Sequence, residues 1–262
     1  MPVGSGSNAA APEKDVCLPA SPRRLGALSG ASGGSLKKMA RLARSTIIGY
    51  PHQVTQRGNY EQTVFEEDSD YRRYLAWLRE CADRYHIEVW AYCLMRNHVH
   101  FVCVPKADGA LAHAFNTLHM RYAQYFHAKK GLTGHLWKGR FLSCMLDERS
   151  VFEEVRFIEN DPVREGVVEK AEDYPWSSAR HHVLGESDPL VMDGCFLNGE
   201  IKDWPAYLAE RGNEPILNRT WQSLKTGRPA GEESFVRGLE GIVGRRLAAL
   251  PRGRPRKTIP ER

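Results

Sequence analysis

Two histidines separated by one residue are the first feature of this sequence that could do chemistry. His98 and His100 lie in the segment Met95–Val104, which reads as a turn followed by a mostly apolar strand. Residues at period two share one face of a strand, so the two imidazoles would point the same way, roughly 7 Å apart along the chain. Two imidazoles placed in this way can bind one metal ion. The alternative interpretation is a half-polar strand that carries two histidines and no ligand.

A third metal ligand could come from the helix predicted over Ser150–Asn160, which Pro162 ends. Phe157 and Asp161 are four residues apart and therefore lie on one helix face. A carboxylate at this position could complete a metal site with the two histidines. An acidic residue at a helix end before a proline is also common where no metal binds.

A basic window follows the histidine strand. Residues 109–146 contain no Asp or Glu, whereas they carry five Lys or Arg residues with interleaved aromatic residues. Cations can neutralise phosphates and flat rings can stack on unpaired bases, so this composition favours nucleic acid over a merely solvated helix face. The candidate DNA-binding cations are Arg121, Lys129, Lys130, Lys138 and Arg140.

The charge of the chain is uneven. The net charge is +5, while residues 1–38 carry +3 and residues 219–262 carry +7, so the middle is acidic. Basic ends of this kind suggest a polyanionic partner, with solubility as the alternative explanation. The segment Arg252-Gly253-Arg254-Pro255 is similar to the core of an AT-hook, which inserts arginines into a narrow A·T minor groove. Arg252 and Arg254 are therefore further candidate DNA contacts, although a plain basic tail has the same composition.

Length and composition indicate one main globular domain with extensions. The chain has 262 residues, 42% of them hydrophobic, which is enough to bury a core. No apolar run approaches a membrane span, and the first residues lack the apolar core of a signal peptide. None of the six cysteines forms a C-x-x-C pair, so we expect reduced thiols in a cytoplasmic protein.

Hydrophobic periodicity predicts the order β-α-β-β-α-β-α. This order fits an α+β fold with a ferredoxin-like (RRM-like) antiparallel sheet and helices on one face, followed by a final helix that carries residues 157 and 161. The predicted strands are 50–57, 87–94, 98–104 and 140–146, and the predicted helices are 66–85, 111–126 and 150–160.

Composition also divides the chain into four parts. Residues 1–38 are rich in Gly, Ala, Ser and Pro and should be a disordered extension, with Met39 as an alternative start. Residues 39–185 should form the catalytic or DNA-binding domain. Residues 186–250 should form an irregular wrap with weak helical segments near 204–211 and 235–247, and residues 251–262 a basic tail.

Four motifs in the same order resemble the single-tyrosine transposases of insertion sequences, most closely the REP-associated tyrosine transposases of bacterial chromosomes. The resemblance runs from about Met39 to Gly185, and two short segments near the C-terminus resemble that branch as well. The four motifs are Met95–His100, Gly134–Phe141, Asn160–Val168 and Asp173–Ser178, and the two C-terminal segments are Thr226–Pro229 and Gly253–Arg256.

The resemblance implies specific properties. Such proteins have a ferredoxin-like fold, form homodimers, and bind single-stranded or hairpin DNA, here possibly REP-like repeats, with Mg²⁺ or Mn²⁺. A tyrosine attacks the scissile phosphate and becomes joined to it, so that strands are cut and rejoined in transposition. His98 and His100 match the family's metal ligands, and Asp161 stands where the family commonly has Asn or Gln. Phe157 stands at the position of the nucleophilic tyrosine, and a phenyl ring has no hydroxyl.

Three functional hypotheses follow. The first is a metal-dependent enzyme that cuts and rejoins DNA strands. The second is a catalytically silent descendant that binds DNA as a repressor or structural factor, which Phe157 favours for this copy. The third is an RNA-binding module of the same fold, against which the absence of an aromatic RNP-type signature counts. Tyr122 and Tyr125 are fallback nucleophiles, and both also fit core or stacking roles.

Overall fold

The structure is a computed structural model that describes residues 46–249. The extension expected over 1–38 and the tail 251–262, with Arg252 and Arg254, lie outside the described residues. Within them, no helix is long and apolar enough to cross a membrane. The cysteines of this part are buried free thiols, namely Cys81, Cys93, Cys103, Cys144 and Cys195.

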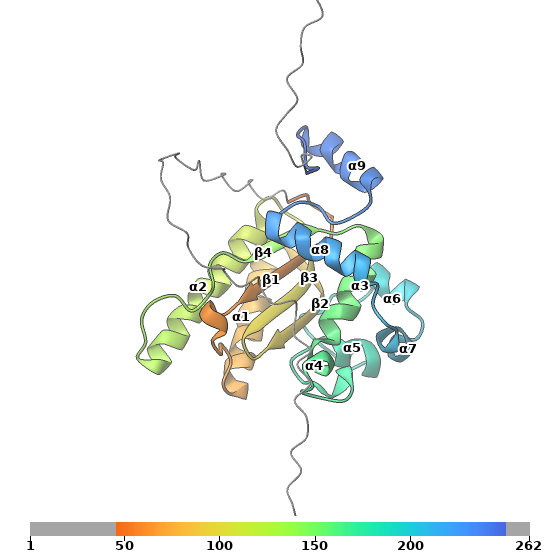
Figure 1. The fold of residues 1–262 in the computed structure, drawn as a ribbon. Helices are drawn as coiled ribbons and strands as arrows, with labels where there is room; N and C mark the ends of the chain where they lie inside the picture. The colour runs from red at the N-terminus through yellow and green to blue at the C-terminus, as the bar shows by residue number, and fades with distance from the viewer. Residues whose placement is uncertain (1–45, 250–262) are drawn as a thin grey trace, which may run out of the picture. The chain divides into compact units, whose positions relative to one another are not determined.

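Four antiparallel strands form one sheet in the described part of the chain (Figure 1). They are β1 (His52–Arg57), β2 (Ile87–Met95), β3 (His98–Pro105) and β4 (Leu142–Met145), in the spatial order β2-β3-β1-β4. Helix α1 (Asp68–Tyr85) joins β1 to β2, and α2 (Ala110–Lys130) joins β3 to β4. This βαββαβ arrangement is ferredoxin-like, so the predicted fold class is confirmed.

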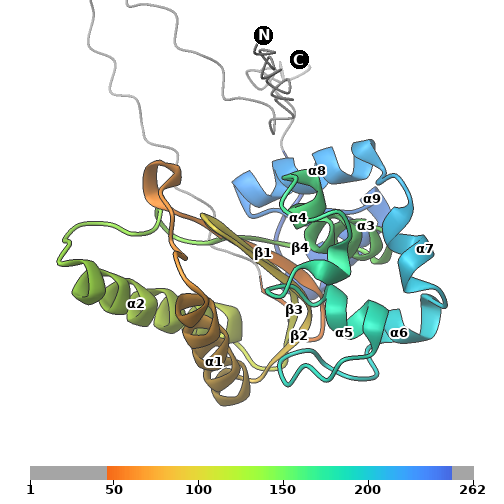
Figure 2. The same cartoon turned by 90° about the horizontal axis from the view of Figure 1, so that it is seen from below.

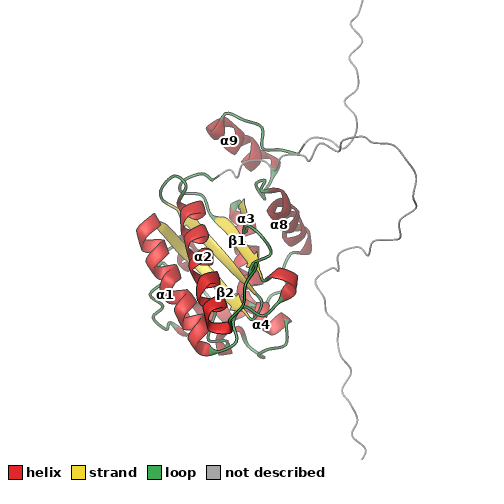
Figure 3. Ribbon diagram, turned by 90° about the vertical axis from the view of Figure 1, so that its left-hand side faces the viewer, coloured by secondary structure: helices red, strands yellow, loops and turns green. Residues whose placement is uncertain are grey.

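Helices α1 and α2 cover one face of the sheet (Figure 3). Their apolar residues recur at helical spacing and pack on alternate residues of the strands, such as Val54 of β1 and Phe101 of β3. Acidic residues in the first turn favour the start of α1, where Glu67 and Asp70 form a capping box. The core of this face includes Tyr74, Leu78, Phe115, Leu118 and Tyr122.

The opposite face of the sheet is covered as well, which the prediction of helices on one face did not include. Helix α3 (Glu148–Glu159) packs there through Val155 and Ile158, together with α5 (Ala179–Leu184) and α8 (Glu214–Thr226) (Figure 2). Strands β2 and β3 are buried at nearly every position, so both of their faces need an apolar cover. Val102 and Val104 of β3 belong to this second core.

Helix α3 ends at Glu159, two residues before Asp161, the candidate third ligand. The side chain of Asp147 caps its first turn by accepting a hydrogen bond from the backbone N–H of Ser150. At the other end Asn160 interrupts the helix, and the short α4 (Asp161–Arg164) begins with Pro162 in its first turn. The amide of Asn160 donates to the carbonyl oxygen of Leu208 at 2.8 Å, which fixes this break to the C-terminal region.

Residues 195–230 pack on the second face of the sheet and on α3. Leu190 and Val191 instead join the core under α1 and α2, and Leu239 packs with Met145 in a third, small cluster. Helix α8 lies against α3 and β4, and the carboxyl end of α7 (Trp204–Ala209) holds Asn160. The weak helical segments expected near 204–211 and 235–247 correspond to α7 and α9 (Glu233–Val243). The remaining elements are α6 (Phe196–Glu200) and the short 3-10 turns η1 (Asn59–Glu61) and η2 (Ala171–Asp173).

Candidate metal centre

His98 and His100 lie at the start of β3 and point to the sheet face that α3 covers. A two-residue turn, Arg96–Asn97, links β2 to β3, so the histidines begin the strand directly after it. Their ring centroids are 5.0 Å apart, and both side chains are buried. The shared face that the period-two spacing predicts is therefore present.

Asp161 completes a group of three converging side chains. Its Oδ2 lies 2.9 Å from Nε2 of His98 and 3.9 Å from Nε2 of His100, and Asp161 is itself buried. The three ligand atoms all lie within 4.8 Å of one another. Metal–ligand bonds of about 2.0–2.2 Å place the ligands of one ion about 3–4 Å apart. Two imidazole nitrogens and a carboxylate oxygen at these separations fit one divalent cation.

The electrostatics of the group suit a ligand role. Burial and the neighbouring charges of His98, Arg164 and Arg57 lower the pKa of His100 to about 3, so its imidazole is neutral at physiological pH. Burial alone would raise the pKa of Asp161, but the hydrogen bond from His98 and the neighbouring positive charges, including that of Arg164, lower it to about 2. A neutral imidazole and an ionised carboxylate are the forms that bind metal.

Two residues outside the predicted site hold the ligands in position. Asn97 Oδ1 lies 2.6 Å from Nδ1 of His98 and accepts a hydrogen bond from it, which orients the ring with Nε2 toward the centre. The guanidinium of Arg164 donates to Asp161 Oδ1, which leaves Oδ2 for the histidines. Sequence reasoning missed both residues, although each lies close along the chain to the ligand that it holds.

Phe157 lies directly beside the three ligands. Its ring is 6.2 Å from the ring of His100, edge to face, and the guanidinium carbon of Arg164 is 3.6 Å from the phenyl centroid. Arg164 also donates to the backbone carbonyl oxygen of Phe157. The position that the resemblance assigns to the nucleophile is thus next to the candidate centre, and it presents a hydrocarbon ring.

The two fallback nucleophiles lie across the sheet from the histidines. The hydroxyl of Tyr122 is buried in the core under α1 and α2, where it donates to the carbonyl oxygen of Val64 at 2.6 Å. Burial raises the pKa of Tyr122. The hydroxyl of Tyr125 donates to Asp70 at 2.9 Å. Neither hydroxyl is available to the histidine group, so the fallback hypothesis was wrong on geometric grounds.

The predicted DNA-binding cations of α2 do not surround the histidines, because α2 packs on the opposite face of the sheet. Each of the three cations on α2, Arg121, Lys129 and Lys130, forms an ion pair with a carboxylate in α1 or in the residues just before it. The absence of acidic residues from α2 is therefore balanced by acidic residues of this neighbouring segment. The pairs are Arg121–Glu80 at 2.5 Å, Lys129 with Glu67 and Asp70 at 2.7 Å each, and Lys130–Glu66.

Lys138 and Arg140 lie elsewhere, in the loop that leads into β4. Both are exposed. The backbone N–H of Lys138 donates to the carbonyl oxygen of Arg57 at 2.9 Å, and Trp137 bridges to Gly58. Since Arg57 is the register partner of His98, this loop lies at the same end of the central strands as the candidate centre.

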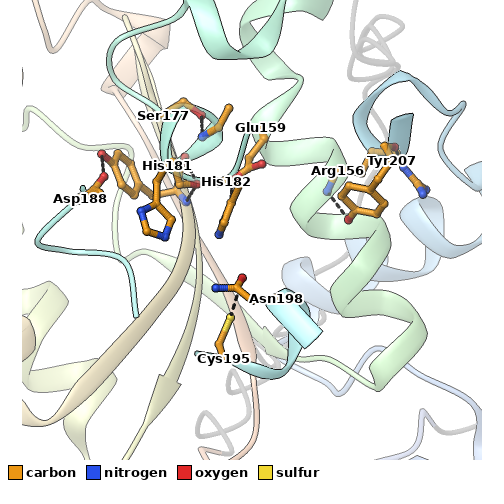
Figure 4. Close-up of polar contacts among 12 residues, drawn as sticks. Arg156, Glu159, Ser177, His181, His182, Asp188, Cys195, Asn198 and Tyr207 are labelled. Atoms are coloured by element: carbon orange, nitrogen blue, oxygen red, sulfur yellow. Dashed lines mark hydrogen bonds and ion pairs between the residues drawn. The ribbon is translucent and has the colours of Figure 1, made fainter. Parts of the chain in front are cut away.

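A second polar group fixes the end of α3. Oε1 of Glu159 accepts hydrogen bonds from Ser178 Oγ at 2.5 Å and from His182 Nδ1 at 2.6 Å. Figure 4 labels Glu159 and His182 at this place. The ring of His182 stacks on Trp204 at 4.0 Å, and Glu159, Ser178 and His182 are all buried. This network ties α3 to α5 and α7, so it supports the helix that carries Phe157.

Comparisons with known proteins bear on the same segment. Residues 49–161 match the model of a transposase family described as IS200-like. A Haemophilus influenzae protein named as a REP-associated tyrosine transposase is 23% identical over 166 residues, which cover 56% of this chain and 94% of that protein. The matched family segment contains the histidine pair, Phe157 and Asp161.

Two solved structures are similar at low identity. A REP-associated tyrosine transposase bound to a REP hairpin is 20% identical, with a TM-score of 0.46, and the match covers 59% of this chain and 92% of that one. A transposase from Deinococcus radiodurans is 16% identical, with a TM-score of 0.34, and the match covers 46% and 97% of the two chains.

Proposed function

We propose that this chain, whose residues 49–161 match the model of an IS200-like transposase family, is a DNA-binding protein whose His98, His100 and Asp161 hold one Mg²⁺ or Mn²⁺ ion. The observation that carries the proposal is the convergence of two Nε2 nitrogens and one carboxylate oxygen in a buried group. A divalent ion held there would polarise a phosphodiester oxygen.

The residues of this chain have separate tasks in the proposal. His98 and His100 supply neutral nitrogen ligands from a rigid strand, and Asp161 supplies the charge that a hard cation prefers. Asn97 and Arg164 orient these ligands. Cutting and rejoining of DNA strands by a covalent intermediate needs an oxygen nucleophile at the same place, and Phe157 does not provide one.

A second candidate function therefore is DNA binding without strand cleavage, as a repressor or structural factor. The edge-to-face contact of Phe157 with His100 favours it, because the ring fills the place of the expected nucleophile. In either form we propose that the DNA is single-stranded or hairpin-shaped, with REP-like repeats as candidates, and that the protein is a homodimer. A cytoplasmic location stays a prediction, which depends on the interpretation of the cysteines as reduced thiols.

The test is binding of a fluorescent DNA hairpin with single-stranded extensions, with and without Mn²⁺, and with a matched RNA hairpin for comparison. We expect Mn²⁺-enhanced DNA binding that the substitution His100→Gln removes, because this change deletes one ligand. His127→Gln on α2 is the matched control. Preference for the RNA hairpin, or an equal response of both variants, would contradict the proposal.

A further inference from the structure

A turn beside the candidate centre has the chemistry of a nucleotide-binding arm. We propose that Arg57 and Tyr60, at the end of β1 and in η1, bind one single-stranded nucleotide, the arginine its phosphate and the tyrosine its base. The proposal rests on the proposed function, since it requires DNA at the histidine centre. Figure 1 shows this turn in orange, directly after β1.

Arg57 shares a sheet face with the histidines. In the antiparallel pairing of β1 with β3, Arg57 lies opposite His98 and Thr55 lies opposite His100. Residues directly opposite each other point to the same face, with Cβ atoms about 4.5–5.5 Å apart. The hydroxyl of Thr55 donates to the carbonyl oxygen of Val99 at 3.0 Å. Arg57 is thus the cationic neighbour of the histidines on this strand.

The guanidinium of Arg57 is available to an incoming phosphate. Its side chain is 28% exposed, and within the described residues its ion pair is with Glu61, at 3.3 Å, whose side chain is 65% exposed. Exposed ion pairs of this kind contribute little to stability, so a phosphate could replace the carboxylate. Arg164, by contrast, is held by Asp161 and by the Phe157 carbonyl. An arginine fork suits two phosphate oxygens at once.

Tyr60 offers a flat face to solvent at the same turn. It is 93% exposed, although tyrosines usually bury most of their ring. Tyr60 and Glu61 both have positive φ values, 51° and 60°, which are uncommon for residues other than glycine. Strained backbone of this kind persists where the surroundings enforce it, and it is enriched at ligand sites. Exposed aromatic rings are the usual stacking platforms for single-stranded bases.

Several contacts tie this turn to the histidine centre. The side chain of Asn97 contacts His98 through Oδ1 and donates from Nδ2 to the carbonyl oxygen of Glu61 at 3.4 Å. The backbone carbonyl oxygen of Asn97 accepts a hydrogen bond from the backbone N–H of Gly58 at 2.8 Å. A Cβ at Gly58 would lie 2.3 Å from the Gln62 carbonyl oxygen, so only glycine fits there. The turn is therefore fixed next to the first ligand.

The experiment uses the full chain and a DNA hairpin with short single-stranded extensions, in which 2-aminopurine replaces one extension base at a time. For Arg57→Gln we expect at least tenfold weaker binding and a salt-dependence slope smaller by about one. Arg79→Gln is the matched control, because Arg79 forms an i,i+4 pair with Asp83 on α1, on the other face of the sheet.

Tyr60 is tested with two substitutions. Tyr60→Asn tolerates the positive φ and removes the ring, so we expect it to abolish the quenching of one 2-aminopurine position and to weaken binding severalfold. Tyr60→Phe keeps the ring and should retain the quenching. Loss of the quenching in Tyr60→Phe as well would contradict stacking.

The outcomes separate the two proposals. One outcome is that the wild-type protein binds the hairpin, that Arg57→Gln binds it as tightly as the control Arg79→Gln, and that Tyr60→Asn keeps the quenching and affinity of the wild type. This outcome would overturn nucleotide binding by Arg57 and Tyr60 and leave the proposed function standing. If the wild-type protein binds no DNA and no Mn²⁺, both are overturned. Mn²⁺ binding should survive in Arg57→Gln, because Arg57 is not a ligand.

Discussion

The phenyl ring of Phe157 meets the imidazole of His100 edge to face, with the ring centroids 6.2 Å apart and the planes at 87°. The helix that carries Phe157 is fixed at its end by the buried hydrogen bonds of Glu159. A side chain at position 157 is therefore held beside the candidate centre by a rigid element. Residue 157 is thus positioned beside the centre, but its phenyl ring carries no oxygen atom that could act as a nucleophile.

Restoring the oxygen is the first test. Phe157→Tyr adds one hydroxyl at nearly constant shape, beside His100 and Asp161, where a metal could activate it. We expect this variant, with Mn²⁺ and hairpin DNA, to form a covalent protein–DNA adduct that the natural sequence does not form. The adduct is detected as a shifted band on a denaturing gel.

Phe152→Tyr is the matched control, because Phe152 lies on the same helix but packs on Phe196, with ring centroids 5.5 Å apart. It should form no adduct. Equal adduct formation by the unmodified protein would show that position 157 is not the place of the nucleophile.

Asn97 is expected to tune metal affinity without binding metal. Asn97→Ala removes the oxygen that fixes the ring of His98, at 2.6 Å from its Nδ1. Loss of such a partner typically lowers metal affinity 10–100-fold. Titration calorimetry with Mn²⁺ measures the change, and the exposed Asn116→Ala on α2 is the control. An unchanged dissociation constant in Asn97→Ala would contradict the orienting role.

Glu154 should make the protein less stable as the pH rises. Burial raises its pKa from 4.5 to about 8, while the hydrogen bond with Thr220 and the charge of Arg164 act in the opposite direction. The folded state therefore holds a proton that the unfolded state releases, and the free energy of unfolding falls between about pH 4.5 and pH 8. The effect is on the order of a few kcal/mol.

Glu154→Gln removes this proton uptake, so its free energy of unfolding should depend less on pH over the same range. Urea unfolding at pH 5 and pH 8 measures the difference, with the exposed Glu169→Gln as the control. If Glu154→Gln keeps the full pH dependence of the natural sequence, another group is responsible for it.

The cations of the basic window should divide into two groups. Neutralising Lys138 and Arg140 should weaken DNA binding and reduce its salt dependence, because both residues are exposed in the loop at the same end of the sheet as the histidines. Neutralising Lys129 and Lys130 should mainly lower the melting temperature, because Lys129 pairs with the buried Asp70 at 2.7 Å. Binding curves and thermal unfolding of both double variants test this division, and the reverse pattern would refute it.

Local patterns predicted the sheet and the histidine pair well. The alternation of β1, the helical spacing of α1 and the short link between β2 and β3 are local signals, and they define the ferredoxin-like order. Period two placed His98 and His100 together, and helical spacing placed Phe157 and Asp161 on one face. These relations depend on residues that are close along the chain.

Features that depend on distant segments could not be read in the same way. The apolar strands β2 and β3 need covers on both faces, but nothing local says that α3 and α8 supply the second one. The cations of α2 look unpaired in the sequence because their carboxylates, such as Glu67 and Asp70, lie about 60 residues earlier. Charge partners across a fold are not visible in a composition window.

The most direct test of the account is Mn²⁺ binding by calorimetry to the natural sequence and to variants at the three ligands, His98→Gln, His100→Gln and Asp161→Ala. We expect the natural sequence to bind one Mn²⁺ per chain, each of the three ligand variants to lose this binding, and His127→Gln to bind normally. Unchanged Mn²⁺ binding in the three ligand variants, or no Mn²⁺ binding by the natural sequence, would contradict it.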